Sequence, residues 1–168
     1  MSVAHRLHAL GARLTPGDKV GDIVLARAKP GDPRIAHLCQ FAAGTPNPIP
    51  PGVYHIICRT PVAPALWFDE GWIAKTQQHL DANWRGMTWE VSIDGRPVDL
   101  AAFGTFDDAT GTGADAGRRR SWNVALERLA GQHTIRTIQR FREEVFDGWA
   151  TYRAGTYDKV NAVTVTLR

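Results

Sequence analysis

The sequence predicts an all-β protein, built as an antiparallel β-sandwich with one short helix and an irregular N-terminal extension. Three observations support this prediction. Several short segments alternate apolar and polar side chains with a period of two, which is the pattern of a half-buried strand. Turn residues separate these segments at intervals of about ten residues, as in β-sandwiches. No segment has the strand–helix–strand pattern of a parallel α/β fold.

The composition is that of one globular domain, because 168 residues are too few for two domains of ordinary size. An apolar fraction of 43%, with six tryptophans and six phenylalanines, is enough for a hydrophobic core and excludes a disordered chain. No apolar run approaches the roughly 18 residues of a membrane-spanning helix, so no membrane insertion is expected. Two cysteines cannot support a disulfide scaffold.

The chain divides into two parts of one domain. Residues 1–51 are expected to form an irregular, proline-rich extension that packs on residues 52–168, which form the sandwich. Within the extension, apolar residues at three- and four-residue spacing predict a frayed helix over residues 1–14. Short strands are expected over residues 20–26 and 35–41, each followed by a turn rich in proline and glycine.

The next segment carries strong strand signals and one helix. β-Branched and aromatic residues predict a strand over residues 53–59, and a short strand follows over 65–68. Residues 73–84 are the best helix candidate, because their interior lacks glycine and proline and Thr76 can cap the helix start. A single helix is expected here.

A hairpin and two long loops are predicted in the second half of the chain. Residues 87–93 alternate strictly and lead into Asp94-Gly95, which predicts a hairpin closed by a type I′ turn. The glycine- and aspartate-rich segment 103–120 is predicted to be a long mobile loop. Residues 143–156 are predicted to form a second long loop.

Three strands are predicted around these loops. Residues 121–126 alternate again, and residues 160–167 close the chain with alternating valine and threonine. Residues 133–141 form a long strand in which two isoleucines are out of phase. That mismatch predicts a β-bulge near Thr137.

Three of these segments resemble the second half of an immunoglobulin-like or fibronectin-like sandwich domain. They are the hairpin from Trp89 to Gly95, the glycine turn and strand from Ala130 to Arg136, and the terminal strand from Val163 to Leu167. The chain is similar to uncharacterised bacterial domains of that kind, in which a tryptophan-rich segment precedes the hairpin. The resemblance covers about half of the chain and implies an immunoglobulin-like β-sandwich. It implies no activity, because one fold carries many functions.

The charge balance argues against a nucleic-acid partner. Twenty Lys and Arg stand against 17 Asp and Glu, and this net charge of +3 is scattered along the chain. The one cluster, Arg118 to Arg120, could bind an anion. The first residues lack the uninterrupted apolar segment of a signal peptide. An exported or envelope-associated protein whose leader has been removed is slightly favoured over a cytoplasmic one.

His37, Cys39, His55 and Cys58 are the most metal-like arrangement in the sequence. Their spacing departs from that of structural zinc sites, and on a strand His55 and Cys58 point to opposite faces. The sequence leaves open whether the two cysteines are free thiols, form one disulfide or ligate a metal. The acidic segment 107–115 lacks the spacing of an EF-hand calcium loop. We therefore expect no metal and no cofactor.

No catalytic motif is present. The sequence has neither the G-x-S-x-G turn of α/β-hydrolases nor the H-E-x-x-H of zinc proteases. Adjacent carboxylates, such as Asp107 and Asp108, diverge on an extended chain, so no such pair alone suits acid–base catalysis. An enzyme would need a histidine beside a carboxylate in a cleft, the candidates being His37, His55, His79 and His133.

The aromatic loop over residues 146–157 favours a non-catalytic module that binds a protein or a carbohydrate. Its aromatic side chains can form a platform for a sugar ring or a partner surface, or can instead cap the core. The predicted ligand-binding residues are Trp149, Tyr152, Tyr157, Arg118, Arg119 and Arg120. The alternatives are a small hydrolase-like enzyme with a His–carboxylate pair and a structural or assembly subunit. The sequence leaves the oligomeric state open.

Overall fold

The computed structural model describes residues 12–28, 35–37, 48–68 and 70–166. Strands account for 57% of the structure and helices for 13%, which confirms the all-β class. The strands form several sheets in which most neighbours run antiparallel. No helix among the described residues is long and apolar enough to cross a membrane.

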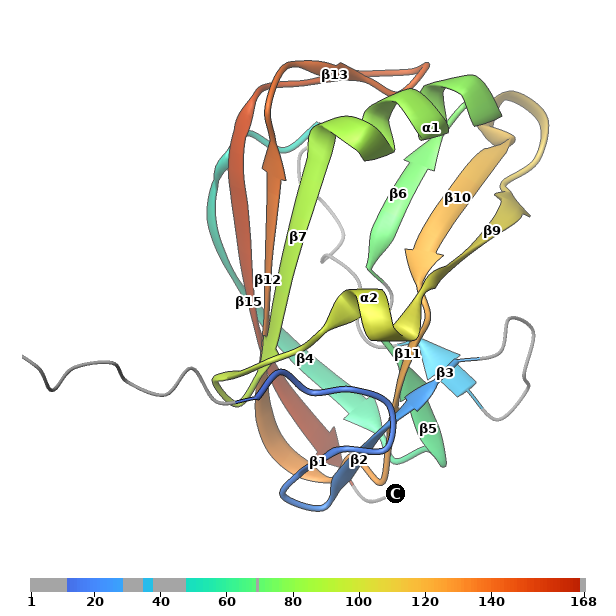
Figure 1. Cartoon of the computed structure of the whole chain (residues 1–168). Helices are drawn as coiled ribbons and strands as arrows, with labels where there is room; N and C mark the ends of the chain where they lie inside the picture. Colours follow the sequence, from blue (N-terminus) through green and yellow to red (C-terminus); the bar gives the residue numbers. More distant parts are fainter. Residues whose placement is uncertain (1–11, 29–34, 38–47, 69, 167–168) are drawn as a thin grey trace, which may run out of the picture.

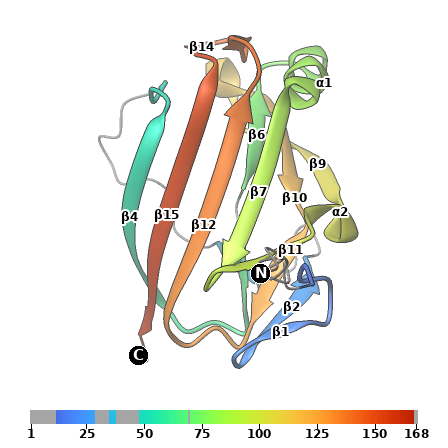
Figure 2. The same ribbon diagram turned by 60° about the vertical axis from the view of Figure 1, so that its left-hand side comes forward.

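One sheet of five strands contains the longest strands of the protein and is here called the long sheet (Figure 2). In spatial order they are β4 (Gly52–Pro61), β15 (Gly155–Thr166), β12 (Gly131–Phe141), β7 (Met87–Ile93) and β8 (Arg96–Pro97). All neighbours are antiparallel except β4 and β15, which run parallel. The register of β12 with β15 is unbroken along the whole of β12, so alternate residues keep to one face throughout.

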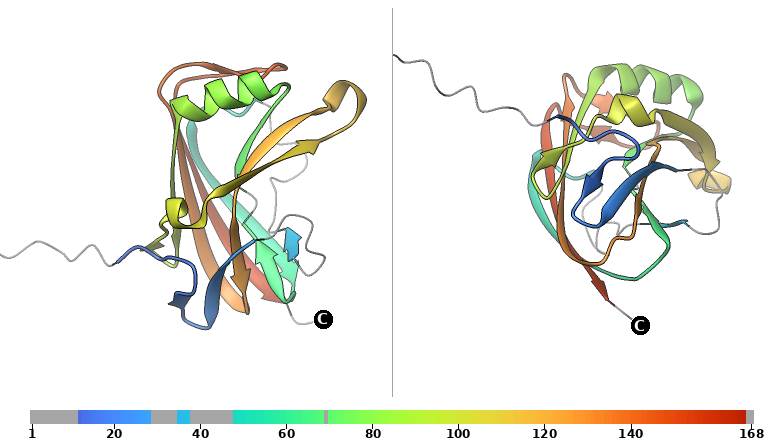
Figure 3. Two further views of the ribbon diagram at one scale, coloured as in Figure 1. Left: turned by 45° about the vertical axis from the view of Figure 1, so that its right-hand side comes forward. Right: turned by 60° about the horizontal axis from the view of Figure 1, so that its bottom comes forward.

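Two smaller sheets lie opposite the long sheet (Figures 1 and 3). The first has the order β1 (Lys19–Val20), β2 (Ile23–Arg27), β11 (Val124–Glu127), β5 (Ala65–Trp67) and β3 (Ile35–His37). The second, here called the hairpin sheet, has the order β6 (Gly71–Ala74), β10 (Gly117–Trp122) and β9 (Thr105–Thr110). Because β10 passes into β11 through Asn123 alone, the two small sheets follow each other along one layer.

Short helices and a small ribbon complete the fold. They are α1 (Gln77–Gly86), α2 (Leu100–Phe103), the 3₁₀ turn η1 (Gly113–Asp115), and the ribbon of β13 (Val145–Phe146) and β14 (Thr151–Tyr152). Figure 1 shows α1 across one end of the molecule, between β6 and β7 and close to β13. Thr76 caps α1 as predicted, since its hydroxyl accepts the His79 N–H at 3.1 Å. The helix begins later than predicted because Ile73 belongs to β6.

The described residues form three apolar clusters, and a polar band separates the two largest, here called the larger and the smaller cluster. Along β12 the inward-facing residues are Ile135 in the larger cluster, then Thr137 and Gln139, then Phe141 in the smaller cluster. The neighbouring strand β15 repeats this order with Val163, Asn161, Lys159 and Tyr157. Residues in register point to the same face, so the band covers the adjacent strands β12 and β15, where Thr137 pairs with Lys159. On β7 the residue in register with Thr137 is the apolar Val91.

An ion pair crosses this polar band from one layer to the other. Lys159 on β15 donates to the carboxylate of Glu70, which directly precedes β6. The two side chains keep only 12% and 13% of their area exposed. Removing Lys159 would leave the Glu70 carboxylate in the interior without this counter-charge. The pair therefore ties the long sheet to the hairpin sheet.

The segment 103–120, predicted to be a long mobile loop, is largely a hairpin. Its strands β9 and β10 pair along their whole length. Asp107 and Asp108 face Arg120 and Arg119 across the hairpin, and each pair forms a salt bridge. The glycine and aspartate content suggested a loop, whereas opposite charges in register stabilise a pair of strands.

The predicted β-bulge near Thr137 is wrong. Thr137 pairs with Lys159 on one side and Val91 on the other, with no inserted residue. The out-of-phase isoleucines have a simpler explanation, because Ile135 points into the core and Ile138 points to the outer face. The fully buried inward position between them belongs to Thr137.

Two predictions for the N-terminal extension fall partly outside the described residues. Only the end of the predicted helix over 1–14 is described, and there Leu14 forms an isolated β-bridge with Val98. Of the strand predicted over 35–41, β3 is the described part. Strands β1 to β3 place the described parts of the extension in the first small sheet.

The turn between β7 and β8 has the predicted type I′ geometry. Asp94 and Gly95 have φ angles of 49° and 79°, positive at both central positions. The Asp94 carboxylate lies 2.7 Å from Nδ1 of His133 and accepts the Thr134 N–H at 2.8 Å. Burial raises the pKa of Asp94, but these two hydrogen bonds outweigh it and hold the pKa below its ordinary value.

The substitution Asp94→Asn tests this bracing of the turn, since asparagine tolerates a positive φ but carries no charge. A carboxylate with a lowered pKa stabilises the fold above about pH 4, and this stabilisation is lost as the pH falls through the folded-state pKa. We expect D94N to lower the free energy of unfolding by about 1 kcal/mol at neutral pH. Urea unfolding at neutral pH and again in acid, below the ordinary aspartate pKa of about 4, should show a smaller difference in acid. A difference of equal size at both pH values would contradict the assignment.

Candidate functional site

The connection between β13 and β14 is a tight turn that carries aromatic side chains, here called the aromatic turn (residues 146–150). Asp147 lies within it and is only 5% exposed. One oxygen of its carboxylate accepts the N–H groups of Trp149 at 2.7 Å and of Ala150 at 2.8 Å. The Asp147 N–H donates in turn to the Ala150 carbonyl at 3.1 Å. These hydrogen bonds fix the backbone shape of the turn.

The aromatic turn packs against the hairpin sheet. The Lys75 N–H donates to the Asp147 carbonyl at 2.7 Å. Gly148 has a φ of +103°, and a Cβ added there would lie 2.3 Å from the Cβ of Lys75, so a larger residue does not fit. The Trp149 indole N–H donates to the Ala114 carbonyl at 3.1 Å. The turn is therefore attached to the opposite layer by backbone and side-chain contacts.

Three large apolar side chains are exposed around this turn: Phe146 at 51%, Ile73 at 43% and Trp149 at 40%. The Trp149 ring covers Gly117, where an added Cβ would lie 2.6 Å from the ring. Ile73 lies on the same face of the hairpin sheet, because it pairs with Arg119, two positions along β10 from Gly117. Trp149 and Ile73 thus expose apolar area on one face of the sheet, whereas Phe146 is exposed on the turn beside α1, where its ring packs edge-on against His79.

The two tyrosines predicted to bind ligand lie behind this surface. Tyr157 is only 2% exposed in the smaller apolar cluster, and its hydroxyl donates to the Arg153 carbonyl at 2.7 Å. Burial removes Tyr157 from any ligand surface, which corrects the prediction. Tyr152 is half-buried with its ring edge-on to Trp72, 4.9 Å between ring centres. Burial, followed by the charge and hydrogen bond of Asp147, raises the pKa of Tyr152.

The arginines predicted to bind an anion divide between the two faces of β10. Arg120 donates to both carboxylate oxygens of Asp107, at 2.7 and 2.6 Å, and to Asp81 of α1 at 2.8 Å. Arg119, on the other face, donates to both oxygens of Asp108 at 3.0 and 2.7 Å. The structure therefore separates neighbours that the sequence grouped as one cluster.

These contacts change the role expected of the arginine cluster. The hydrogen bond from Arg120 lowers the pKa of Asp107 below its usual value. Arg118 donates to the amide oxygen of Gln77 at the start of α1, at 3.2 Å. Two of the three guanidinium groups are held by carboxylates, and all three stabilise the contacts of the hairpin sheet with its neighbours. They do not converge on a common anion site.

A histidine and a carboxylate do meet at hydrogen-bond distance, in His133 and Asp94. The second ring nitrogen, Nε2, lies 2.8 Å from the carbonyl of Ala130. Both nitrogens of His133 are therefore engaged, and neither is available to a substrate. The pair joins the β7–β8 turn to the start of β12 and has a structural role. Of the other candidates, His55 is exposed on β4 and His79 packs edge-on against Phe146.

The predicted metal-like arrangement is only partly described. His55 is exposed and Cys58 is buried, so they point to opposite faces of β4 as predicted. Cys58 takes part in a disulfide bond. The other cysteine, Cys39, and the side chain of His37 lie outside the described residues. Within the part of the chain that is described, no group of three or more His, Cys, Asp or Glu side chains could hold a metal ion.

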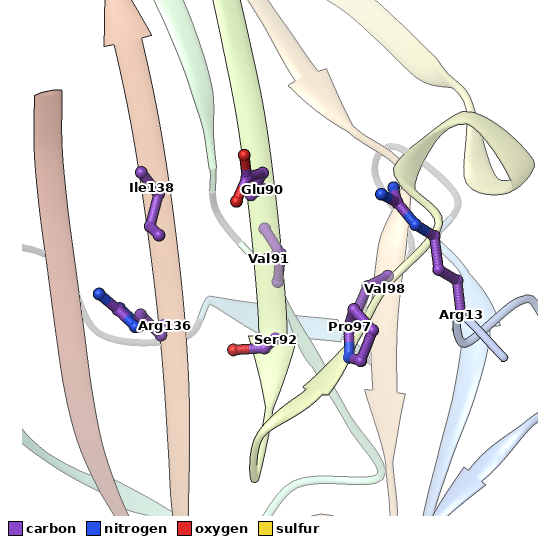
Figure 4. Close-up of a pocket in the computed structure, with 8 residues that line it drawn as sticks. All are labelled: Arg13, Glu90, Val91, Ser92, Pro97, Val98, Arg136 and Ile138. Atoms are coloured by element: carbon purple, nitrogen blue, oxygen red, sulfur yellow. The ribbon is translucent and has the colours of Figure 1, made fainter. Parts of the chain in front are cut away.

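A groove is present on the outer face of the long sheet (Figure 4). It is lined by Arg13, Glu90, Val91, Ser92, Pro97, Val98, Arg136 and Ile138. No histidine lines it, so the His133–Asp94 pair does not face this groove. The aromatic turn packs on the opposite layer, which makes the two features separate.

No protein-family model matches this sequence, and no curated protein or solved structure matches it at a significant level. The function has to be argued from the geometry of the residues themselves.

The sequence analysis predicted Trp149 as a site residue. It missed Ile73, which is exposed on the same face of the hairpin sheet, and Asp147, which holds the turn. Ile73 was assigned to the start of a helix, although it lies on β6. Asp147 received no role, although Asp-Gly is a common turn pair whose aspartate bonds the backbone N–H groups that follow it. That signal was available. The burial of Asp147 could not be predicted from the sequence, because it depends on the packing of the turn against Lys75.

Replacing Asp147 tests whether its carboxylate holds the aromatic turn. Asp147→Ala leaves two N–H groups without their acceptor, and we expect the free energy of unfolding to fall by about 1–3 kcal/mol. Hydrogen exchange at the amides of Trp149 and Ala150 should accelerate. Asp147→Asn keeps an acceptor oxygen and should lose less.

Asp22→Ala is the matched control, because Asp22 is an exposed turn residue. It should change stability by less than about 0.5 kcal/mol. Equal losses in D147A and D22A, or unchanged exchange at Trp149 in D147A, would show that the carboxylate does not hold the turn.

Proposed function

We propose that this protein is a non-catalytic β-sandwich module that binds a protein partner through the aromatic turn. The observation that carries the proposal is the exposure of Trp149 and Phe146 on a turn held by the buried carboxylate of Asp147. A large apolar side chain that is already fixed in position loses little entropy on binding. The turn thus has the physical properties of a binding surface.

The chemistry of this surface favours a protein ligand over a carbohydrate. The Trp149 indole N–H is already bonded to Ala114, so the ring face is the part left for a ligand. Ile73 on the same face of the hairpin sheet and Phe146 on the turn add exposed aliphatic and aromatic area that offers no hydrogen bond to sugar hydroxyls. Interfaces between proteins are enriched in aromatic side chains at their centres, and tryptophan is one of the residues enriched at their hot spots. A sugar ring stacked on Trp149 is the alternative ligand.

The immunoglobulin-like character of the sandwich belongs to the same proposal. Domains of that kind carry their binding loops at the ends of two facing sheets. In support, the aromatic turn lies at the end of the molecule where α1 spans the distance between the two layers (Figure 1). The likeness is one of arrangement, since α1 and the divided second layer are additions to such a domain.

Selection of a random peptide display library on the immobilised protein tests the proposed function. We expect peptides with apolar or aromatic anchors to be enriched. Trp149→Ala should weaken their binding at least about tenfold, because truncation of a central tryptophan costs 2 kcal/mol or more. Phe146→Ala should weaken it less. A glycan array probed in parallel measures carbohydrate binding, which is the alternative function of this turn.

Val53→Ala is the control for these variants, because Val53 is also a large exposed apolar residue, 62% exposed, but lies on β4 of the long sheet. It should leave peptide binding unchanged. If the native protein binds glycans but no peptides, and W149A loses the glycan binding, then the ligand is a carbohydrate and not a protein. Peptide binding that W149A and V53A affect equally would reject the aromatic turn as the site.

A further inference from the structure

We propose that the groove on the outer face of the long sheet is a second binding site, for a small organic carboxylate. Its volume is about 200 Å³, whereas pockets for drug-sized molecules measure roughly 300–1,000 Å³. The space therefore suits a small molecule. This site is independent of the aromatic turn and of the function proposed for it.

The groove is built on paired strands and has an apolar base. Arg136 on β12, Ser92 on β7 and Pro97 on β8 are in register and form one row across three strands. Neighbouring strands are about 4.8 Å apart, so this row spans roughly 10 Å. Ile138 and Pro97 supply apolar surface to either side of Ser92 (Figure 4). Because the strands are hydrogen-bonded to each other, the shape of the groove exists before a ligand binds.

Two of the charged residues in the groove are neutralised by neighbours. Glu90 accepts a hydrogen bond from Arg140 at 2.5 Å. Arg136 donates to both oxygens of Asp158, at 2.8 and 2.5 Å, and Asp158 is buried. These pairs leave the middle of the groove with no net charge of their own.

Arg13 is the charged residue of the groove without an ion-pair partner among the described residues. Its backbone position is fixed through the next residue, since the Leu14 N–H donates to the Pro97 carbonyl at 2.8 Å and the Asp99 N–H donates to the Leu14 carbonyl at 2.9 Å. Leu14 itself is fully buried. Figure 4 shows Arg13 entering on the β8 side of β7, opposite Arg136. Within the described part of the chain, the groove thus carries one positive charge without an ion-pair partner, on the exposed side chain of Arg13.

This combination selects a carboxylate with an apolar body. A guanidinium group binds a carboxylate through two parallel N–H groups. The Ser92 hydroxyl, half-buried in the same groove, can donate a further hydrogen bond. The apolar part of the ligand would then lie on Pro97 and Ile138. Charge and apolar contact are both needed, which separates this site from a simple anion site.

A two-dimensional NMR titration of the full chain with sodium benzoate tests the proposal, with benzamide as a neutral probe of the same shape. We expect benzoate to shift the amides of residues 90–93 and 136–138, and benzamide to shift them at least about fivefold less at equal concentration. Inorganic phosphate provides a charge without an apolar body and should bind more weakly than benzoate.

Arg13→Gln should reduce the affinity for benzoate at least about fivefold, because the charged partner is lost. Arg85→Gln is the matched control, since Arg85 is an exposed arginine at the far end of α1. The spectra of both variants report directly that each is folded. The proposal would be overturned if benzoate shifted none of these amides, or if benzamide shifted them as much as benzoate. It would also be overturned if R13Q bound benzoate as tightly as the native protein, or if phosphate bound as tightly as benzoate.

Discussion

Lys159 and Glu70 meet inside the protein, where the long sheet faces the hairpin sheet across a band of polar residues. Apolar packing alone would let the two layers adjust against each other, since hydrophobic burial is not directional. A buried ion pair is directional, and it is stable only in the arrangement that keeps both charges paired. The polar band, which includes Thr137 and Gln139, therefore sets how the layers are placed.

The aromatic turn depends on that placement. It belongs to the connection between β12 and β15 of the long sheet, but it is fixed on the other layer by Lys75, Ala114 and the surface of Gly117. The buried carboxylate of Asp147 gives the turn its shape, and the ion pair gives the two layers their relative position. Exposure of Trp149 follows from both, because the indole is fixed along one edge and open on a face.

Local sequence predicted most of the long sheet: alternating or β-branched residues indicated its strands, and Asp94-Gly95 indicated the turn. Thr76 likewise indicated the cap of α1. The first residues of β15 were instead predicted to belong to a loop. The β9–β10 hairpin was missed, because its Arg–Asp pairs form only when residues 13 and 11 positions apart come into register. The inward position of Thr137 was missed because Ile135 and Ile138 were both expected to face the core, although Ile138 lies on the outer face. The groove joins residues of three strands, and no short segment of sequence displays such a surface.

A double-mutant cycle on Glu70→Gln and Lys159→Met tests most directly whether this ion pair holds the layers together. K159M alone should cost about 3–5 kcal/mol of unfolding free energy, since the Glu70 charge is left without its partner. The coupling energy of the cycle should reach about 2 kcal/mol, within the range measured for residues in contact. Hydrogen exchange at the Trp149 amide should accelerate in K159M. A coupling energy below about 0.5 kcal/mol, with exchange at Trp149 unchanged, would contradict the account.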